Sequence, residues 1–189
     1  DNIMSSFGKF MCLVHDSGNL IVNADDKNVM KVLESNFDAL TKKNVNIYTF
    51  SAKDSNANLF ANNINLMNTG CYEFDVLYNK NKICHIKLSA PGRHNILNAL
   101  ATVGVVIANN IDLNLAVAGL EEFTGASRRF EFKKNINNTV EVYDDYAHHP
   151  TEIKATLQTA KEKSKGRTIA VFQPHTYSRL KTLLDEFAT

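Results

Sequence analysis

The sequence predicts an α/β fold: a parallel sheet with flanking helices plus a small antiparallel meander, followed by the start of a second α/β unit. Apolar runs of strand length alternate with amphipathic helical patterns before residue 50 and again after residue 138, as in βαβ units. Between these parts, three strand-like segments follow one another without a helix, which is typical of a meander. With 189 residues, 44% of them hydrophobic, the chain is long enough to bury a core.

The first 50 residues are predicted to hold three strands and one helix. Short apolar runs at residues 10–14 and 20–24 are consistent with buried strands, and residues 45–50 return as a strand. Between the last two, apolar residues recur at helical spacing: Val29, Val32, Leu33 and Phe37. The last two strands and this helix therefore form a βαβ unit. Of Asp25 and Asp26, which precede the helix, one is explained as its N-cap, and a ligand-contacting carboxylate is the alternative.

Residues 57–89 carry the predicted meander. The strand-like segments lie at residues 59–66, 71–78 and 83–88. Asn68-Thr69-Gly70 separates the first two, and a short polar stretch separates the others, as in hairpins. No function is visible in this region.

The next predicted helix runs to Ala108 and is apolar nearly all round, so we expect it to be buried. Apart from Thr102, its polar side chains lie in or just after the first turn: His94, Asn95 and Asn98. A buried amide must be hydrogen-bonded. The local backbone is one possible partner, and a planar ligand edge such as adenine, whose N6/N7 pattern an Asn amide matches, is the other.

A further short helix is expected at residues 112–123, and residues 125–127 resemble a linker. Arg128 and Arg129 follow it and open a new strand. Two arginines beside a linker are usually solvated, although a cleft between domains is where a phosphate-binding arginine would lie.

Titratable groups are densest between Val142 and Glu152. Residues 139–143 alternate as a half-buried strand does, and Pro150 suits the first position of a helix. Apolar residues then repeat at helical spacing: Ile153, Leu157 and Ala160. Between the strand and the helix lie two carboxylates, a phenol and two imidazoles: Asp144, Asp145, Tyr146, His148 and His149. A tight turn needs no such set, so this stretch is interpreted as a functional site.

A continuous apolar run at residues 168–172 predicts a strand of a parallel sheet covered on both faces. The intervening helix would make this strand parallel to residues 139–143, with both carboxyl ends at the same edge. The loop after it carries His175 and Arg179. We therefore expect these side chains to meet the turn at residues 144–149, where open α/β sheets bind ligands.

Composition excludes several classes of protein. The net charge of +1, without a basic run, argues against a nucleic-acid partner. The longest apolar run, residues 103–108, is too short to span a membrane. Cys12, Cys71 and Cys84 form no CxxC pair, so neither a disulfide framework nor a metal site is expected. Free thiols of this kind suit a reducing, cytoplasmic location.

Three motifs occur in order along the chain. They are PGRHNILNALA at residues 91–101, SRRFE at 127–131 with DDYAHHPTE after it, and FQPHTYSR at 172–179. In this order and spacing they resemble the Mur ligases of peptidoglycan synthesis. The resemblance covers the whole chain and is strongest from about Ala90 onward.

This resemblance implies a three-domain, ATP-dependent ligase. Residues 1–126 would be the later part of its central ATP-binding domain, and residues 127–189 the first part of a C-terminal, amino-acid-binding, Rossmann-like domain. The start at Asp1 without an initiator Met, and the end inside an amphipathic pattern, likewise lead us to expect a piece of a longer protein.

The resemblance also implies the reaction. In this family ATP phosphorylates the carboxylate of UDP-N-acetylmuramate, and the amino group of L-alanine attacks the acyl phosphate to give an amide, ADP and phosphate. ATP and Mg²⁺ are therefore the implied cofactors, and the two other reactants are the implied partners. The phosphate loop and the Mg²⁺ ligands are expected upstream of Asp1, and no metal ligand is expected within the chain.

The family's functional residues map onto the motifs. The residues implied to bind ATP are His94, Asn95, Asn98, Arg129 and Asp145. The residues implied to line the amino-acid pocket are Tyr146, His148, His175 and Arg179. His148 is also the catalytic candidate, and Arg179 is the expected partner of the alanine carboxylate, because guanidinium pairs with carboxylate bidentately. Thr176 stands where some relatives carry a second arginine.

Three alternatives remain open from the sequence. A related ligase could use another amino acid, and a ligase of the same family recycles a muropeptide onto UDP-N-acetylmuramate. A non-catalytic nucleotide-binding module could keep the fold without the phosphate loop. A Gly-rich loop ending in Lys-Thr upstream of Asp1 would favour the ligase.

Overall fold

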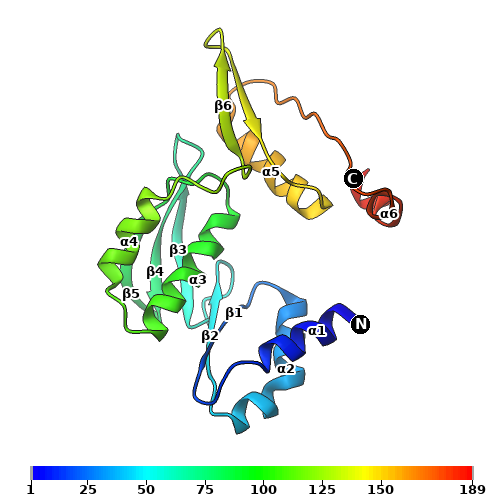
Figure 1. Ribbon diagram of the computed structural model, residues 1–189. Coiled ribbons are helices and arrows are strands. Elements are labelled where there is room, and N and C mark those ends of the chain that lie inside the picture. The colour runs from blue at the N-terminus through cyan, green and yellow to red at the C-terminus, as the bar shows by residue number, and fades with distance from the viewer. Residues whose placement is uncertain (1, 189) are drawn as a thin grey trace.

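Five strands in the computed structural model form one mixed sheet, in the order β1-β2-β3-β4-β5 (Figure 1). The structure describes residues 2–188. The strands of this sheet are β1 (Asn19–Asn23), β2 (Asn46–Ser51), β3 (Leu59–Leu66), β4 (Tyr72–Tyr78) and β5 (Asn81–Lys87). β1, β2 and β3 run parallel, while β4 is antiparallel to both of its neighbours. The predicted parallel sheet and meander are thus one continuous sheet, and the α/β fold class is confirmed.

The predicted βαβ unit is confirmed as β1, α2 (Lys27–Lys42) and β2. Asp26 caps α2 by accepting two backbone N–H groups of the first turn. Asp25 accepts the hydroxyl of Ser51 and the N–H of Ala52, which ties the end of β1 to the end of β2. Both acids therefore have a structural partner.

The strand predicted at residues 10–14 is wrong, because the chain begins with the helix α1 (Asn2–Met11). One face of α1 packs against α2 through Met4 and Met11. Three further apolar side chains of α1 lie beside this face and are exposed: Ile3, Phe7 and Phe10. Apolar residues thus recur at helical spacing along the whole of α1, and the short run at its end shows only part of that pattern.

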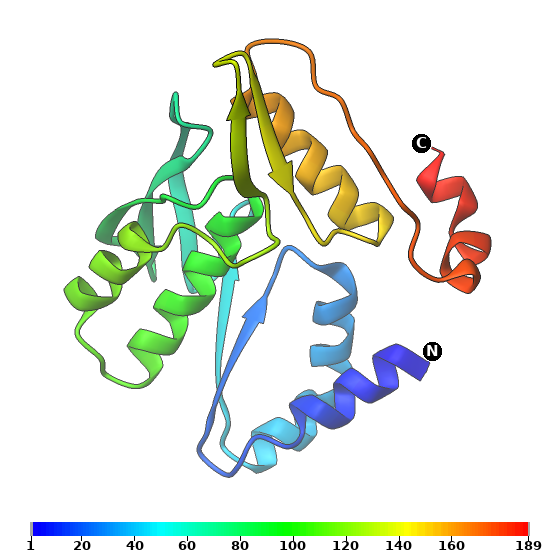
Figure 2. The same ribbon diagram turned by 45° about the horizontal axis from the view of Figure 1, so that its top comes forward.

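Helices cover both faces of the parallel part of the sheet (Figure 2). α3 (His94–Ala108) packs against β1, β2 and β3, and α4 (Leu113–Glu122) lies beside α3 and against β5. Successive side chains of a strand point to opposite faces, so Ile21 packs towards α3 while Leu20 and Val22 join α1 and α2. The core under α3 contains fully buried side chains: Leu59, Phe74, Ile86, Ile96 and Leu100. The helix predicted to be buried is thus buried on the face that meets the sheet, whereas Asn98, Thr102 and Val105 on its other face are exposed.

The second unit begins with an antiparallel hairpin of β6 (Glu131–Ile136) and β7 (Val140–Asp144). α5 (Pro150–Lys163) follows, with Pro150 at the start of the helix as predicted. His149 and Glu152 form a capping box there: His149 Nδ1 accepts the N–H of Thr151, and the Glu152 carboxylate accepts the N–H groups of His148 and His149. The chain then reaches two short helices, α6 (Tyr177–Thr182) and α7 (Leu184–Phe187).

The strand predicted at residues 168–172 is wrong. This segment runs from α5 to α6 without strand pairing (Figure 1), and Ile169 and Val171 are 70% and 96% exposed. Where the structure describes the chain, β7 pairs only with β6. A strand requires a neighbour for its N–H and C=O groups, and no strand of the described chain offers one to this segment. The parallel pair expected to join residues 139–143 and 168–172 is therefore absent.

Candidate functional site

The first turn of α3 lies directly against α5. Gly92, with φ +101°, makes this approach possible, because a Cβ atom there would lie 2.7 Å from both His94 Cε1 and Thr159 Oγ1. Thr159 is only 2% exposed, although it belongs to an otherwise half-exposed helix. The PGRHN motif is thus where the two units of the chain meet.

The two amides of α3 are used differently. Asn95 Nδ2 donates to the carbonyl of Pro91 at 2.8 Å, which is the local backbone partner considered above. Asn98 Nδ2 donates to Asn95 Oδ1 at 2.9 Å, and the Asn98 side chain is exposed. Among residues 2–188 no donor reaches Asn98 Oδ1. Asn98 therefore keeps an open amide edge, whereas Asn95 is committed to the fold.

His94, Arg129 and Asp145 share one electrostatic neighbourhood. Desolvation lowers the pKa of His94; the nearby carboxylate of Asp145 opposes the shift, and the cation of Arg129 adds to it. The imidazole is therefore neutral at pH 7. Three of the residues implied to bind ATP, from two units of the chain, are thus brought together.

Asp145 ties the turn after β7 to the turn before β6. Its Oδ2 accepts the N–H of Phe130 and its Oδ1 accepts the N–H of Ala147, both at 2.7 Å. The N–H of Tyr146 donates to the carbonyl of Arg128 at 2.8 Å. The Asp145 carboxylate thus holds these two turns together. Its contact with a ribose stays a prediction.

The guanidinium of Arg129 is only weakly paired. Its Nη1 lies 4.0 Å from Glu152 Oε1, and its side chain is 52% exposed. The hydrogen bond from the backbone N–H of His148 is the main cause that lowers the pKa of Glu152. This carboxylate therefore interacts mainly with the start of α5 and only weakly with Arg129. A guanidinium so weakly paired is available to an anion.

Rings connect the turn after β7 to the FQPHTYSR loop. The ring of Tyr146 lies edge-on to that of His148, with centroids 5.0 Å apart, and His148 lies 6.4 Å from His175. His148 Nδ1 is 2.8 Å from the carbonyl of Tyr146. Because a carbonyl only accepts, Nδ1 carries the proton in the neutral ring and Nε2 is left as the base. The predicted meeting of His148 and His175 is thus present, even without the parallel strands.

Arg179, which was expected in the loop, lies on the helix α6. It lines a hollow of about 330 Å³ on α6, together with Thr176, Ser178, Thr182 and Leu183. The strand pair that was expected to place Arg179 beside the turn after β7 is not formed. Its contact with an amino-acid carboxylate therefore stays a prediction.

The sequence interpretation missed a contact between α5 and the first unit, which we call the α5 seat. On α5 it consists of Thr159, Glu162 and Lys163. On the first unit it consists of Gly70, Tyr72 and Gly92. Lys163 Nζ donates to the carbonyl of Thr69 at 3.4 Å, and a Cβ at Gly70 would lie 2.9 Å from Lys163 Cβ. Burial raises the pKa of Tyr72, Glu162 raises it further, and Arg93 opposes both. The i, i+3, i+4 spacing of the three α5 residues is the signal that could have suggested a shared face.

Two further kinds of site were searched for in residues 2–188. No group of three or more His, Cys, Asp or Glu side chains in this part of the chain is placed to hold a metal ion. No helix there combines the length and apolar character that crossing a bilayer requires.

Comparison with known proteins follows the same division of the chain. Residues 1–106 match the Mur ligase middle domain, and residues 128–189 match the Mur ligase glutamate ligase domain. The chain is 49% identical over 189 residues to the UDP-N-acetylmuramate–L-alanine ligase of Caldicellulosiruptor bescii, covering 100% of this chain and 39% of that protein. It is 45% identical over 187 residues to the ligase of the same name from Clostridium beijerinckii, with 99% and 39% covered.

A solved structure is also similar. The UDP-N-acetylmuramate-alanine ligase of Thermotoga maritima matches with a TM-score of 0.65 and 30% identity, over 87% of this chain and 43% of that one. The fold and the site thus define an α/β protein whose candidate ligand site lies between two units. The chain belongs to the Mur ligase family, and it spans 39% of the length of the curated relatives quoted above.

Proposed function

We propose that this chain is part of a cytoplasmic, ATP-dependent ligase that joins L-alanine to UDP-N-acetylmuramate in peptidoglycan synthesis. The names of its relatives support this reaction. The observation that carries the proposal is the convergence of His94, Arg129 and Asp145 between the two units. We assign residues 1–126 to the later part of the central ATP-binding domain and residues 127–189 to the first part of the amino-acid-binding domain.

The residues at the start of α3 fit the nucleotide. Asn98 offers an exposed amide edge of the kind that matches adenine, and the neutral His94 can donate or accept one hydrogen bond beside it. Arg129 supplies a weakly paired cation for the phosphates. When bound, ATP supplies the phosphoryl group that activates the muramate carboxylate.

Residues 2–188 hold no group of three or more His, Cys, Asp or Glu side chains placed to bind a metal ion, and we derive no step through Mg²⁺. Phosphoryl transfer depends on positioning the β- and γ-phosphates, and the sequence contains no GxxxxGK[ST] loop. In the proposed site, residues 2–188 thus supply the contacts to adenine and to the amino acid.

His148 is the proposed catalytic base. L-alanine must lose a proton from its ammonium group before or as its nitrogen attacks the acyl phosphate, and Nε2 of His148 can accept that proton. Tyr146 and His175 flank His148 and would form the walls of the pocket.

Substrate dependence in the full-length protein tests the proposal. We expect phosphate release from ATP only when both UDP-N-acetylmuramate and L-alanine are present. Equal or faster turnover with a muropeptide would reassign the chain to the recycling ligase. Absence of turnover with any amino acid or peptide would favour the non-catalytic module.

Arg179 is tested in the same assay. Arg179→Ala should raise the KM for L-alanine roughly tenfold to a hundredfold by removing a charge-assisted contact, and Arg179→Lys should raise it less. The KM for ATP should change much less in both variants. An unchanged KM for L-alanine in Arg179→Ala removes this residue from the amino-acid site.

A further inference from the structure

We propose that Arg128, the first arginine of the SRRFE motif, is a positioning residue that fixes the ring of Tyr146 and thereby orients His148. The inference rests on the proposed function, in which His148 accepts the proton of the alanine amine. Arg128 itself would touch neither substrate.

Arg128 holds Tyr146 at two points. Its Cζ atom lies 4.6 Å from the centroid of the Tyr146 ring, a cation–π arrangement. Its carbonyl accepts the backbone N–H of Tyr146 at 2.8 Å. Tyr146 is 44% exposed, so an aromatic side chain at the surface is held by a cation on one side.

The turn that carries Arg128 is conformationally strained and firmly held. Arg128 and Phe130 have φ values of 57° and 48°, in the left-handed region that non-glycine residues rarely adopt. Glu131 Oε2 accepts the N–H of Arg128 and Asp145 Oδ2 accepts the N–H of Phe130, both at 2.7 Å. Strained residues that persist under such contacts are typical of preorganised functional sites.

The position of Tyr146 is passed on to His148 in two ways. The carbonyl of Tyr146 lies 2.8 Å from His148 Nδ1, and the two rings meet edge to face at 5.0 Å. The first contact selects the tautomer with Nε2 free, and the second limits rotation of the imidazole. A catalytic base must be held within hydrogen-bond reach of the proton it takes. The contacts from Arg128 through Tyr146 to His148 should therefore affect kcat of the proposed reaction.

An exposed ion pair is the competing explanation for Arg128. Its Nε lies 3.6 Å from Asp144 Oδ2, with the side chains 57% and 42% exposed. Exposed pairs of this kind contribute little. Asp144→Asn removes the ion pair and leaves the cation over Tyr146, so this variant separates the two explanations.

The test compares Arg128→Met and Arg128→Lys with two controls, Asp144→Asn and Lys134→Met, the latter removing an exposed charge from β6. In the 189-residue chain, NMR measures the nuclear Overhauser contacts between the ring protons of Tyr146 and His148. We expect these contacts to be lost in Arg128→Met, weakened in Arg128→Lys because the planar guanidinium is gone, and kept in both controls.

In the full-length protein, Arg128→Met should lower kcat about three- to tenfold and leave the KM for ATP within about twofold. Preserved ring contacts in Arg128→Met would overturn the proposal, as would equal losses in Asp144→Asn. A KM for ATP that rises as much as kcat falls would instead make Arg128 a nucleotide ligand. If Arg128→Met fails to fold, Arg128→Lys decides by the same criteria. Because the NMR comparison uses no substrate, a failure of the proposed ligase activity is recognised separately.

Discussion

Asn95 and Asn98 lie one turn apart on α3, yet their amides have different surroundings. The Asn95 amide donates to the carbonyl of Pro91, whereas the Asn98 amide is exposed and, among residues 2–188, is bonded only to Asn95. At the scale of single residues, the sequence pattern located both amides, but it could not assign them. That assignment depends on which carbonyl lies within reach, and the path of the preceding loop decides this.

Asn98→Ala in the full-length protein should raise the KM for ATP roughly three- to tenfold, since a hydrogen bond to a neutral ring edge is lost. The midpoint of urea unfolding should hardly change, because the side chain is exposed. Asn95→Ala is the control, and it should destabilise the fold by about 1 kcal/mol through the lost bond to Pro91. A large loss of stability in Asn98→Ala with an unchanged KM would identify Asn98 as structural.

At the scale of helices and strands, prediction succeeded where the signal is local. Asp26 is the N-cap of α2 and Pro150 is the first residue of α5, and each acts within its own helix. Residues 10–14 and 168–172 were both assigned to strands from apolar runs, and neither is one. A strand depends on a neighbour that is often far away in sequence, so a short apolar run does not determine its own structure.

The α5 seat supplies a prediction at this scale. Gly92→Ala should destabilise the chain by about 1–3 kcal/mol, because a side chain would meet His94 and Thr159 and the left-handed backbone would be strained. Gly119→Ala is the matched control: nothing lies within 4 Å of the added Cβ, and the position is helical. It should stabilise by about 0.5–1 kcal/mol. Urea unfolding of both variants measures the difference, and equal values would remove the steric argument.

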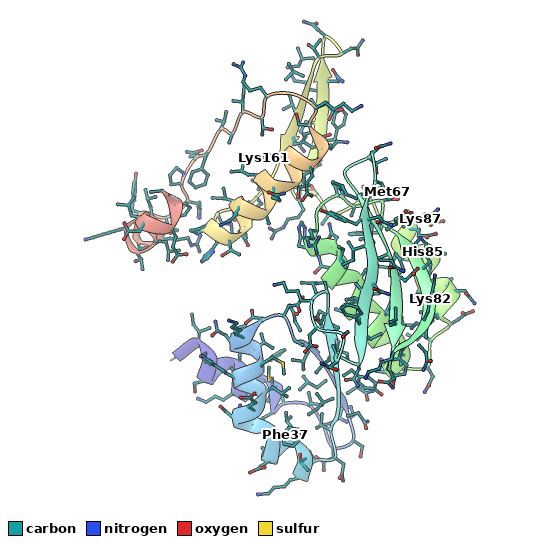
Figure 3. The ribbon with its side chains drawn as sticks, turned by 180° about the vertical axis from the view of Figure 1, so that it is seen from behind. Phe37, Met67, Lys82, His85, Lys87 and Lys161 are labelled. Carbon is teal, nitrogen blue, oxygen red and sulfur yellow. The ribbon has the colours of Figure 1, made fainter. Side chains whose placement is uncertain are left out.

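The outward face of the meander predicts a pH dependence. Asp75 on β4 lies 2.7 Å from Lys82 Nζ, 2.9 Å from Asn63 Nδ2 and 2.8 Å from His85 Nδ1, and Figure 3 shows Lys82 and His85 along β5. The hydrogen bond from Lys82 is the main cause that holds the pKa of Asp75 far below its usual range, with Asn63 and His85 adding to it.

A depressed carboxylate pKa stabilises the folded state above the unfolded pKa, about 3.9, and this stabilisation is lost as pH falls towards the folded value. The free energy of unfolding should therefore decline below about pH 4, and Asp75→Asn should flatten the decline. Urea unfolding between pH 2 and 7 tests this. Parallel curves for the two proteins would show that other carboxylates control the acid limb.

At the scale of the whole molecule, the two units differ in how much they bury. The core lies under α3, whereas α5 buries one side chain fully and the segment after it packs little. The sequence predicted the α/β class and the order of the units. It did not predict that Gly92 meets Thr159 and that Gly70 meets Lys163, because contacts between distant positions leave no periodic pattern.

Hydrogen exchange should follow this difference. In the 189-residue chain, amides of α3 between Ile96 and Ile107 should exchange more slowly than those between Val140 and Phe172, because local opening is cheapest where little apolar surface is buried. Equal protection of the two regions would contradict this prediction.

The seat of α5 also has a mechanical consequence. α5 has 14 residues and is therefore about 21 Å long; its first turn carries the histidine-bearing loop and its last turn rests on the β3–β4 hairpin. A rigid rod of that length, tilted by about 5° at the hairpin, swings its far end by about 2 Å. Displacements of about 1 Å at reacting groups can change rates about a hundredfold. A change at the tip of the β3–β4 hairpin, about 20 Å from His148, would thus alter the position of the proposed catalytic histidine.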